Sequence, residues 1–118
     1  MLQMSPQVLS RVAEYFKILS ETSRLQILCS LKSGSKNVSE IMEITQLGQA
    51  NVSKHLKVLT QAGMVERQPQ GVSVFYEIAD STIFELCNLV CDRLIEHLQI
   101  DSKELMQLEV LKTSISNK

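Results

Sequence analysis

The sequence has few of the residues that interrupt helices and no apolar run long enough to cross a membrane. Its 118 residues include four Gly and two Pro, so most of the chain is expected to be helical with short connections. The N-terminus lacks the charged segment and apolar core of a secretory signal. We predict a single domain over residues 1–118, located in the cytoplasm and without a membrane partner.

Cysteines and aromatic residues are also scarce. Three cysteines, an odd number, suit a reducing compartment in which thiols stay free. Aromatic residues make up 4% of the chain and Trp is absent, which argues against a stacking platform for single-stranded nucleic acid. The sequence lacks a Gly-rich phosphate loop, a Ser/His/Asp order and a CxxC redox motif. These absences predict that the protein is not an enzyme.

Charge is unevenly distributed although the net charge is only -1. Residues 1–76 carry eight Lys or Arg and five Glu, whereas residues 77–118 carry four positive and eight negative side chains. The first part therefore has a net charge of +3 and the second a net charge of -4. Such an asymmetry lets one end meet a polyanion while the other meets protein.

Two helices are predicted at the start of the chain. Apolar residues recur at three- and four-residue spacings over residues 5–18, which is typical of an amphipathic helix. Ser20 or Thr22 is expected to cap a second helix, and Gly34 to end it. Its inward side chains are predicted to be Leu25, Leu28, Cys29 and Leu31.

A helix-turn-helix is predicted over residues 37–62. Asn37 or Ser39 is expected to begin its first helix, and the turn follows at residues 47–48. The second helix stops at residues 62–63, an Ala-Gly pair. Two helices joined by a tight turn that contains Gly are typical of this DNA-binding unit.

The remaining segments complete a winged helix. Residues 64–79 are rich in β-branched and aromatic side chains on either side of residues 69–71, which predicts a hairpin, the wing. A long helix is expected over residues 81–98 and a tail helix over residues 102–115. The predicted fold class is mainly α (α+β): a winged helix-turn-helix with long N- and C-terminal dimerisation helices.

The exposed face of the second helix of this unit is the predicted DNA-reading surface. Gln and Asn can pair with adenine, Lys can reach guanine or phosphate, and Ser suits either. On the wing, polar residues are expected to reach the backbone or the minor groove. The candidate DNA-binding residues are Gln49, Asn51, Ser53, Lys54, His55, Lys57, Arg67, Gln68 and Gln70.

Two copies of the chain are expected to bind together. The apolar stripe of the long helix, which includes Ile83, Leu86 and Val90, is more than so small a domain can cover alone. We therefore predict a homodimer that pairs residues 5–18 and 81–98 of the two subunits. Its partner would be double-stranded operator DNA of pseudo-palindromic sequence.

Four segments of the sequence resemble the ArsR/SmtB winged-helix repressors. They are residues 19–28 (LSETSRLQIL), 50–59 (ANVSKHLKVL), 62–65 (AGMV) and 76–80 (YEIAD), and the pattern SxHLxxLxxAGxV is the most specific of them. The resemblance extends over roughly residues 8–98. It implies a homodimeric bacterial repressor that leaves its operator when an inducer binds.

Two inducer sites known in that family, for arsenite and for zinc, lack their ligand residues in this sequence. The arsenite type places a CxCxxC cluster where residues 40–46 contain no Cys. The zinc type needs His at two positions that hold Thr82 and Arg93 here, between Asp80 and Glu96, and Arg cannot ligate zinc.

Sulfur chemistry is the remaining route to induction. Cys29 resembles one cysteine of the persulfide-sensing SqrR/BigR subgroup, whose second cysteine lies on the fifth helix, where Cys87 and Cys91 occur. The resemblance thus implies a thiol-reactive inducer, persulfide or oxidant, and no required cofactor.

Several alternatives stay open at this point. The three thiols could instead hold arsenite, another soft metal such as Cu(I), or haem, with His97 as a further haem ligand. They could also be inert packing residues, because free Cys is among the most buried residue types. A more distant alternative is a winged helix that binds only protein. This alternative and the DNA-binding hypothesis differ in whether Lys54, Lys57 and Arg67 contribute to binding of a promoter fragment.

Overall fold

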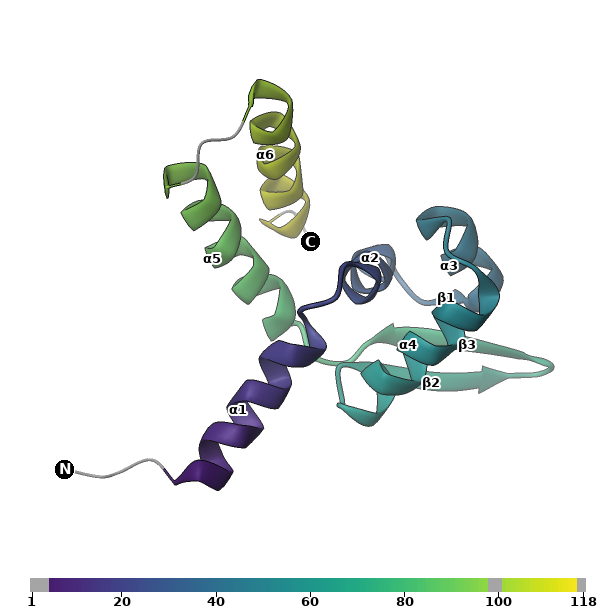
Figure 1. Cartoon of the computed structure of the whole chain (residues 1–118). Helices are drawn as coiled ribbons and strands as arrows, with labels where there is room; N and C mark the ends of the chain where they lie inside the picture. The colour runs from purple at the N-terminus through teal and green to yellow at the C-terminus, as the bar shows by residue number, and fades with distance from the viewer. Residues whose placement is uncertain (1–4, 98–100, 117–118) are drawn as a thin grey trace. The chain divides into compact units, whose positions relative to one another are not determined.

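The structure is a computed structural model that describes residues 5–97 and 101–116 (Figure 1). The chain divides into two compact units, Met1–Ala79 and Asp80–Lys118. Within the described ranges, no helix is both long and apolar enough to cross a membrane. Leu98, at the end of the predicted long helix, lies outside the described residues.

Two helices open the first unit. Helix α1 spans Pro6–Ile18, and the Ser5 hydroxyl caps it by accepting a hydrogen bond from the backbone N–H of Val8. Helix α2 spans Thr22–Ser30 and begins after Glu21 without a side-chain cap. The predicted cap at Ser20 or Thr22 is therefore wrong, because the Ser20 hydroxyl instead donates to the carbonyl of Lys17 at the end of α1.

The helix-turn-helix consists of α3 (Val38–Thr45) and α4 (Gln49–Gln61). Asn37 begins α3 with a capping box: its side chain accepts from the Glu40 N–H, and the Glu40 carboxylate accepts from the Asn37 N–H, both at 2.9 Å. Gln46 ends α3 in the left-handed region (φ 61°). Only two residues then separate it from α4, so the predicted unit is confirmed.

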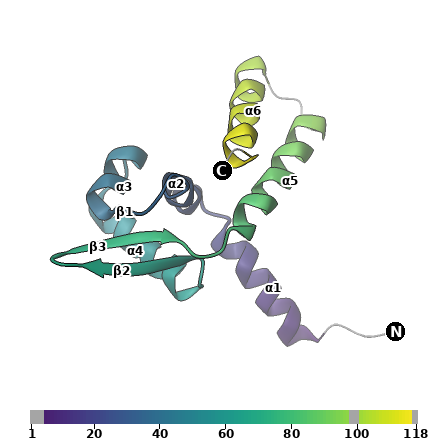
Figure 2. The same cartoon turned by 180° about the vertical axis from the view of Figure 1, so that it is seen from behind.

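A small antiparallel sheet forms the wing. Strands β2 (Val65–Gln70) and β3 (Ser73–Ile78) pair along their full length, and Gly71 at the tip has φ +63°, which favours glycine (Figure 2). The hairpin is confirmed, although Pro69 belongs to strand β2 rather than to the turn. A third strand that the sequence did not predict, β1 (Lys36–Asn37), pairs with the other side of β3.

The core of the first unit joins α2, α3, α4 and the base of the wing. Each of these elements contributes apolar side chains that are at most 1% exposed. Because α4 supplies three of them, its orientation is set by core packing. The residues are Ile27, Leu28, Ile41, Val52, Leu56, Leu59, Met64 and Val65.

The second unit is a pair of packed helices, α5 (Thr82–His97) and α6 (Ser102–Ser116). The Asp80 and Asp101 carboxylates accept hydrogen bonds from backbone N–H groups in the first turns of α5 and α6. Lys112 of α6 forms an ion pair with Asp92 of α5. The two helices occur where the sequence predicted them.

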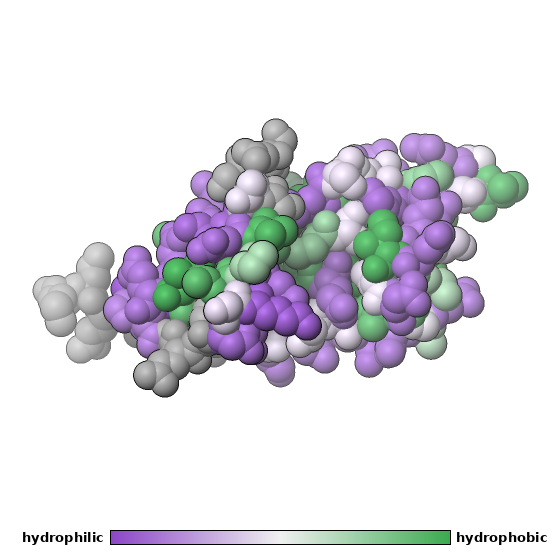
Figure 3. All heavy atoms as spheres, turned by 90° about the horizontal axis from the view of Figure 1, so that it is seen from above, coloured by the Kyte–Doolittle hydropathy of each residue, from purple (hydrophilic) through white to green (hydrophobic). Residues whose placement is uncertain are grey.

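Several large apolar side chains among the described residues remain exposed, and green patches interrupt the hydrophilic surface in Figure 3. Val90, which belongs to the apolar stripe that the sequence assigned to the dimer interface, is 57% exposed in the single chain. The exposed large apolar residues are Val8, Leu9, Val12 and Phe16 on α1, Ile44 on α3, Val72 in the turn of the wing, Leu89 and Val90 on α5, and Met106 and Val110 on α6.

Candidate nucleic-acid interface

The outward face of α4 is polar over its first two and a half turns. Its exposed side chains alternate with Val52 and Leu56, which are buried in the core. The anchored apolar face therefore holds the polar face in a fixed orientation toward solvent, as a recognition helix requires. The exposed candidates are Gln49, Asn51, Ser53, Lys54 and Lys57.

His55 does not belong to this outward face. Its side chain is 3% exposed, so the prediction that it contacts DNA directly is wrong. Residues at spacings of three and four lie on one side of a helix, and His55 shares the inward side with Val52 and Leu59. That spacing is the signal in the sequence that identifies it as an inward residue.

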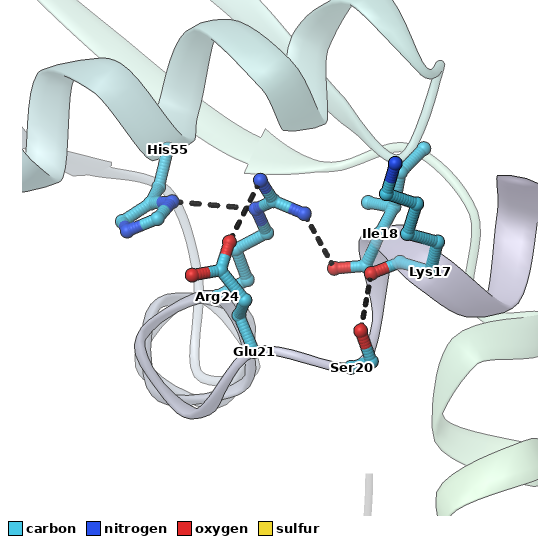
Figure 4. A network of polar contacts seen from close by, with 6 residues as sticks. All are labelled: Lys17, Ile18, Ser20, Glu21, Arg24 and His55. Atoms are coloured by element: carbon cyan, nitrogen blue, oxygen red, sulfur yellow. Dashed lines mark hydrogen bonds and ion pairs between the residues drawn. The ribbon is translucent and has the colours of Figure 1, made fainter.

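His55 belongs to a polar network centred on Arg24, which the sequence did not reveal (Figure 4). The Arg24 guanidinium donates Nε–H to His55 Nδ1 at 3.3 Å. It also donates Nη1–H to the carbonyl of Ile18 at 3.2 Å and forms an ion pair with Glu21 at 2.8 Å. A side chain of α2 thus bonds simultaneously to the end of α1 and to α4.

His55 is held neutral by its surroundings. Burial lowers the pKa of His55 below its ordinary value of 6.5, and the charges of Lys54 and Arg24 lower it further, while Glu21 opposes the shift. Because a guanidinium has no acceptor, the Nδ1 atom must be the unprotonated nitrogen and Nε2 carries the hydrogen. The network therefore selects one tautomer of the imidazole.

The wing exposes its three predicted residues on strand β2. Arg67, Gln68 and Gln70 are all exposed. The Gln68 side chain donates a hydrogen bond to the carboxylate of Glu77 on the adjacent strand, which orders it along the hairpin. Arg67 and Gln70 are thus the residues on this strand that we expect to reach DNA most readily.

The three cysteines occupy different environments. Cys29 is exposed, so the prediction that it faces the interior is wrong, because Ile27, Leu28 and Leu31 occupy the buried side of that segment. The pKa of the Cys29 thiol is raised by partial desolvation, an effect that the nearby positive charge of Lys32 only partly offsets. Cys87 is half-buried, and Cys91 is 4% exposed. The burial of Cys91 is typical of a cysteine that packs as a small apolar side chain.

The structure offers little for a metal. Among the residues it describes, no three His, Cys, Asp or Glu side chains lie close enough together to hold one. Arg93 and Glu96, at two of the positions that correspond to the zinc type, form an exposed ion pair at 3.9 Å.

Known proteins share this architecture. The family model described as "Bacterial regulatory protein, arsR family" matches residues 21–67. The uncharacterized HTH-type transcriptional regulator MJ1325 of Methanocaldococcus jannaschii is 36% identical over 81 residues, which are 68% of this chain and 91% of that protein. The chain belongs to the ArsR/SmtB family. The predicted family and fold class are thereby confirmed.

Two further relatives of this ArsR/SmtB chain are informative. The biofilm growth-associated repressor of Xylella fastidiosa is 32% identical over 79 residues, 67% of this chain and 69% of that protein. The homodimeric winged helix-turn-helix DNA-binding domain Mb0332 of Mycobacterium bovis superposes with a TM-score of 0.67 at 31% identity, over 86% of this chain and 99% of that one. ArsR/SmtB proteins are transcriptional regulators rather than enzymes.

Proposed function

We propose that this protein is a homodimeric repressor that binds operator DNA through α4 and the wing and leaves it when a thiol-reactive inducer arrives. The observation that carries the proposal is the exposed polar face of α4 opposite a fully buried one. Positive charge accompanies this face at Lys54, Lys57 and Arg67, and Lys and Arg supply the phosphate contacts on which affinity for DNA largely rests.

The exposed apolar face of α1 supports the dimer. Val8, Leu9, Val12 and Phe16 lie within about 100° on the helix at 100° per residue, and each is between 45% and 56% exposed. A contiguous apolar stripe of this kind marks a protein interface. The Mycobacterium bovis relative is homodimeric, and two joined α4 helices would read two half-sites of a pseudo-palindromic operator.

Base-reading and phosphate-binding residues should respond differently to substitution. We expect Gln49→Ala or Asn51→Ala to cost about 1 to 3 kcal/mol on the operator and to relax sequence preference, because each removes an amide that can pair with a base. Lys57→Ala should weaken binding to all duplexes and reduce the dependence on salt. Fluorescence anisotropy with the operator and a scrambled duplex measures both effects.

Equal losses on the two duplexes for the Gln49 and Asn51 variants would show that neither residue reads bases. Gln61→Ala is a matched control, since this exposed residue lies at the opposite end of α4. Its affinity should equal that of the wild type on both duplexes.

The exposed position of Cys29 makes its thiol accessible to an inducer, while the desolvation that raises its pKa keeps the thiolate fraction small, so that a reactive persulfide or oxidant is needed. In the proposed step, the Cys29 thiolate attacks the sulfane sulfur of a low-molecular-weight persulfide, forming a Cys29 persulfide and releasing the thiol. The thiolate of Cys87 or Cys91 then attacks the Cys29 sulfur. A disulfide forms, and the sulfane sulfur leaves reduced as hydrosulfide. With an oxidant, a Cys29 sulfenic acid would condense with the second thiol and release water.

A Cys29→Ser variant should bind the operator as the wild type does but should not be released by persulfide. The substitution is at an exposed position, so the fold and α4 are unaffected, while the attacking thiol is lost. A mobility-shift assay with and without glutathione persulfide checks this, and mass spectrometry identifies the bridge. Release that persists in the variant would remove Cys29 from the mechanism.

Cys87→Ser and Cys91→Ser serve as paired variants in the same assay. The one that resolves Cys29 should leave a Cys29 persulfide without a bridge, whereas the other should behave as the wild type. If both variants still form a bridge, neither cysteine is required as the resolving thiol.

A further inference from the structure

Arg24 holds three parts of the first unit at fixed separations. Its guanidinium contacts Glu21 before α2, the carbonyl of Ile18 in the last turn of α1 and His55 in the middle of α4 (Figure 4). The Arg24 side chain is only 15% exposed. Solvent therefore screens these contacts much less than it screens an ion pair on the surface.

The chemistry of the contacts requires an arginine. A guanidinium is planar and presents its N–H groups in a fixed fork, so bonds made by Nε, Nη1 and Nη2 at once constrain the positions of all three partners. A lysine could keep the charge and one bond but not the geometry. The two longer bonds, to Ile18 and His55, link α1 directly to α4.

We infer that Arg24 is a positioning residue that couples the end of α1 to the recognition helix α4, and that protonation of His55 breaks this coupling and weakens DNA binding. This inference rests on the proposed function, because α1 carries the dimer face and α4 the DNA face. It goes beyond that function by giving DNA binding a dependence on pH through a residue that does not contact DNA.

The sign of the pH effect follows from the groups that face His55. Neutral His55 accepts the Arg24 Nε–H, whereas protonated His55 has no acceptor and adds a cation beside Arg24 and Lys54. Among the described residues, Glu21 is the charge that opposes this effect. Burial lowers the pKa of His55, so the folded form favours neutral imidazole. The stabilisation that the folded chain gains from neutral His55 is complete above the ordinary pKa of 6.5. It is lost as the pH falls through the lowered pKa of the folded form.

The test is anisotropy with a labelled promoter duplex between pH 8 and pH 5, with circular dichroism at each pH to verify folding. Wild-type affinity should be constant above pH 6.5 and fall below it, by at most about tenfold per pH unit for one group. His55→Asn keeps an acceptor close to the Nδ1 position and does not titrate, so its profile should be flat. His97→Asn, at the other histidine, should keep the wild-type profile.

Arg24→Lys tests the positioning role separately. Its affinity at pH 7.5 should fall by about 3- to 10-fold, the worth of a partly buried hydrogen bond, with its pH dependence reduced and its dimer mass unchanged. Nitrogen-15 NMR of wild-type imidazoles requires no variant: His55 should be the Nε2–H tautomer and should titrate below pH 6.5. A His55 that titrates at or above its ordinary pKa would overturn the inference.

The outcomes distinguish a failure of the pH coupling from a failure of DNA binding itself. Tight binding with a flat profile in the folded wild type, or a full pH dependence in His55→Asn, overturns the inference and leaves the proposed function intact. No binding to duplex DNA at any pH overturns the proposed function and the inference together.

Discussion

Replacing Phe16 with Glu is expected to convert the protein to a monomer and to weaken operator binding by roughly 10²- to 10⁴-fold. Phe16 is 56% exposed in the single chain, so the substitution removes little from the fold of one subunit. A carboxylate there would be buried without a partner in the dimer, which is strongly unfavourable. The loss of affinity follows because two linked half-site contacts become one. Sedimentation velocity and anisotropy measure the two effects.

Ser10→Glu is the matched control for this prediction. Ser10 is exposed on the same helix but lies on the side away from Val8 and Phe16 at 100° per residue. The same charge placed there should leave both the mass and the affinity unchanged. A dimeric Phe16→Glu protein with wild-type affinity would show that the α1 stripe does not form the interface.

Leu56→Ala is expected to lower the free energy of unfolding by about 2 to 5 kcal/mol, because the leucine is 1% exposed and its truncation leaves a cavity in the core. For a chain of this size, each kcal/mol should lower the melting temperature by about 3 to 6 °C. Thermal melts should be compared at equal protein concentration, since dimerisation adds stability by mass action.

The neighbouring Lys57→Ala variant is the natural comparison. Lys57 is exposed, so its replacement should change stability by no more than about 0.5 kcal/mol while weakening DNA binding. The Leu56→Ala substitution would thus affect stability, and the Lys57→Ala substitution at the next position would affect DNA binding. A Leu56→Ala protein that melts with the wild type would contradict the placement of α4 on the core.

The sequence predicted the elements whose signals are local. The capping residue Asn37 and the Gly63 after α4 mark the limits of the helix-turn-helix, and the change of period after Gly63 marks the wing. Strand β1 was missed because two residues are too few to show an alternating pattern. It forms only because β3 offers a free edge for pairing.

The errors at the candidate site have a common physical cause. The polar side chain of His55 predicts a place on the DNA face, although its spacing from Val52 and Leu59 puts it inside. The apolar character of Cys29 predicts a place in the interior, although other side chains already fill that side of α2. The partner that makes a buried His55 acceptable, Arg24, is 31 residues away in sequence, and such a tertiary contact has no local signal.

Sedimentation equilibrium of the protein with its own labelled promoter duplex shows whether a dimer reads DNA through α4. We expect two subunits per duplex, a preference over a scrambled duplex of at least roughly 10³-fold, and a reduction of that preference by about 5- to 150-fold in Asn51→Ala. A single bound subunit, or equal affinity for both duplexes, would contradict a dimer that reads DNA through α4.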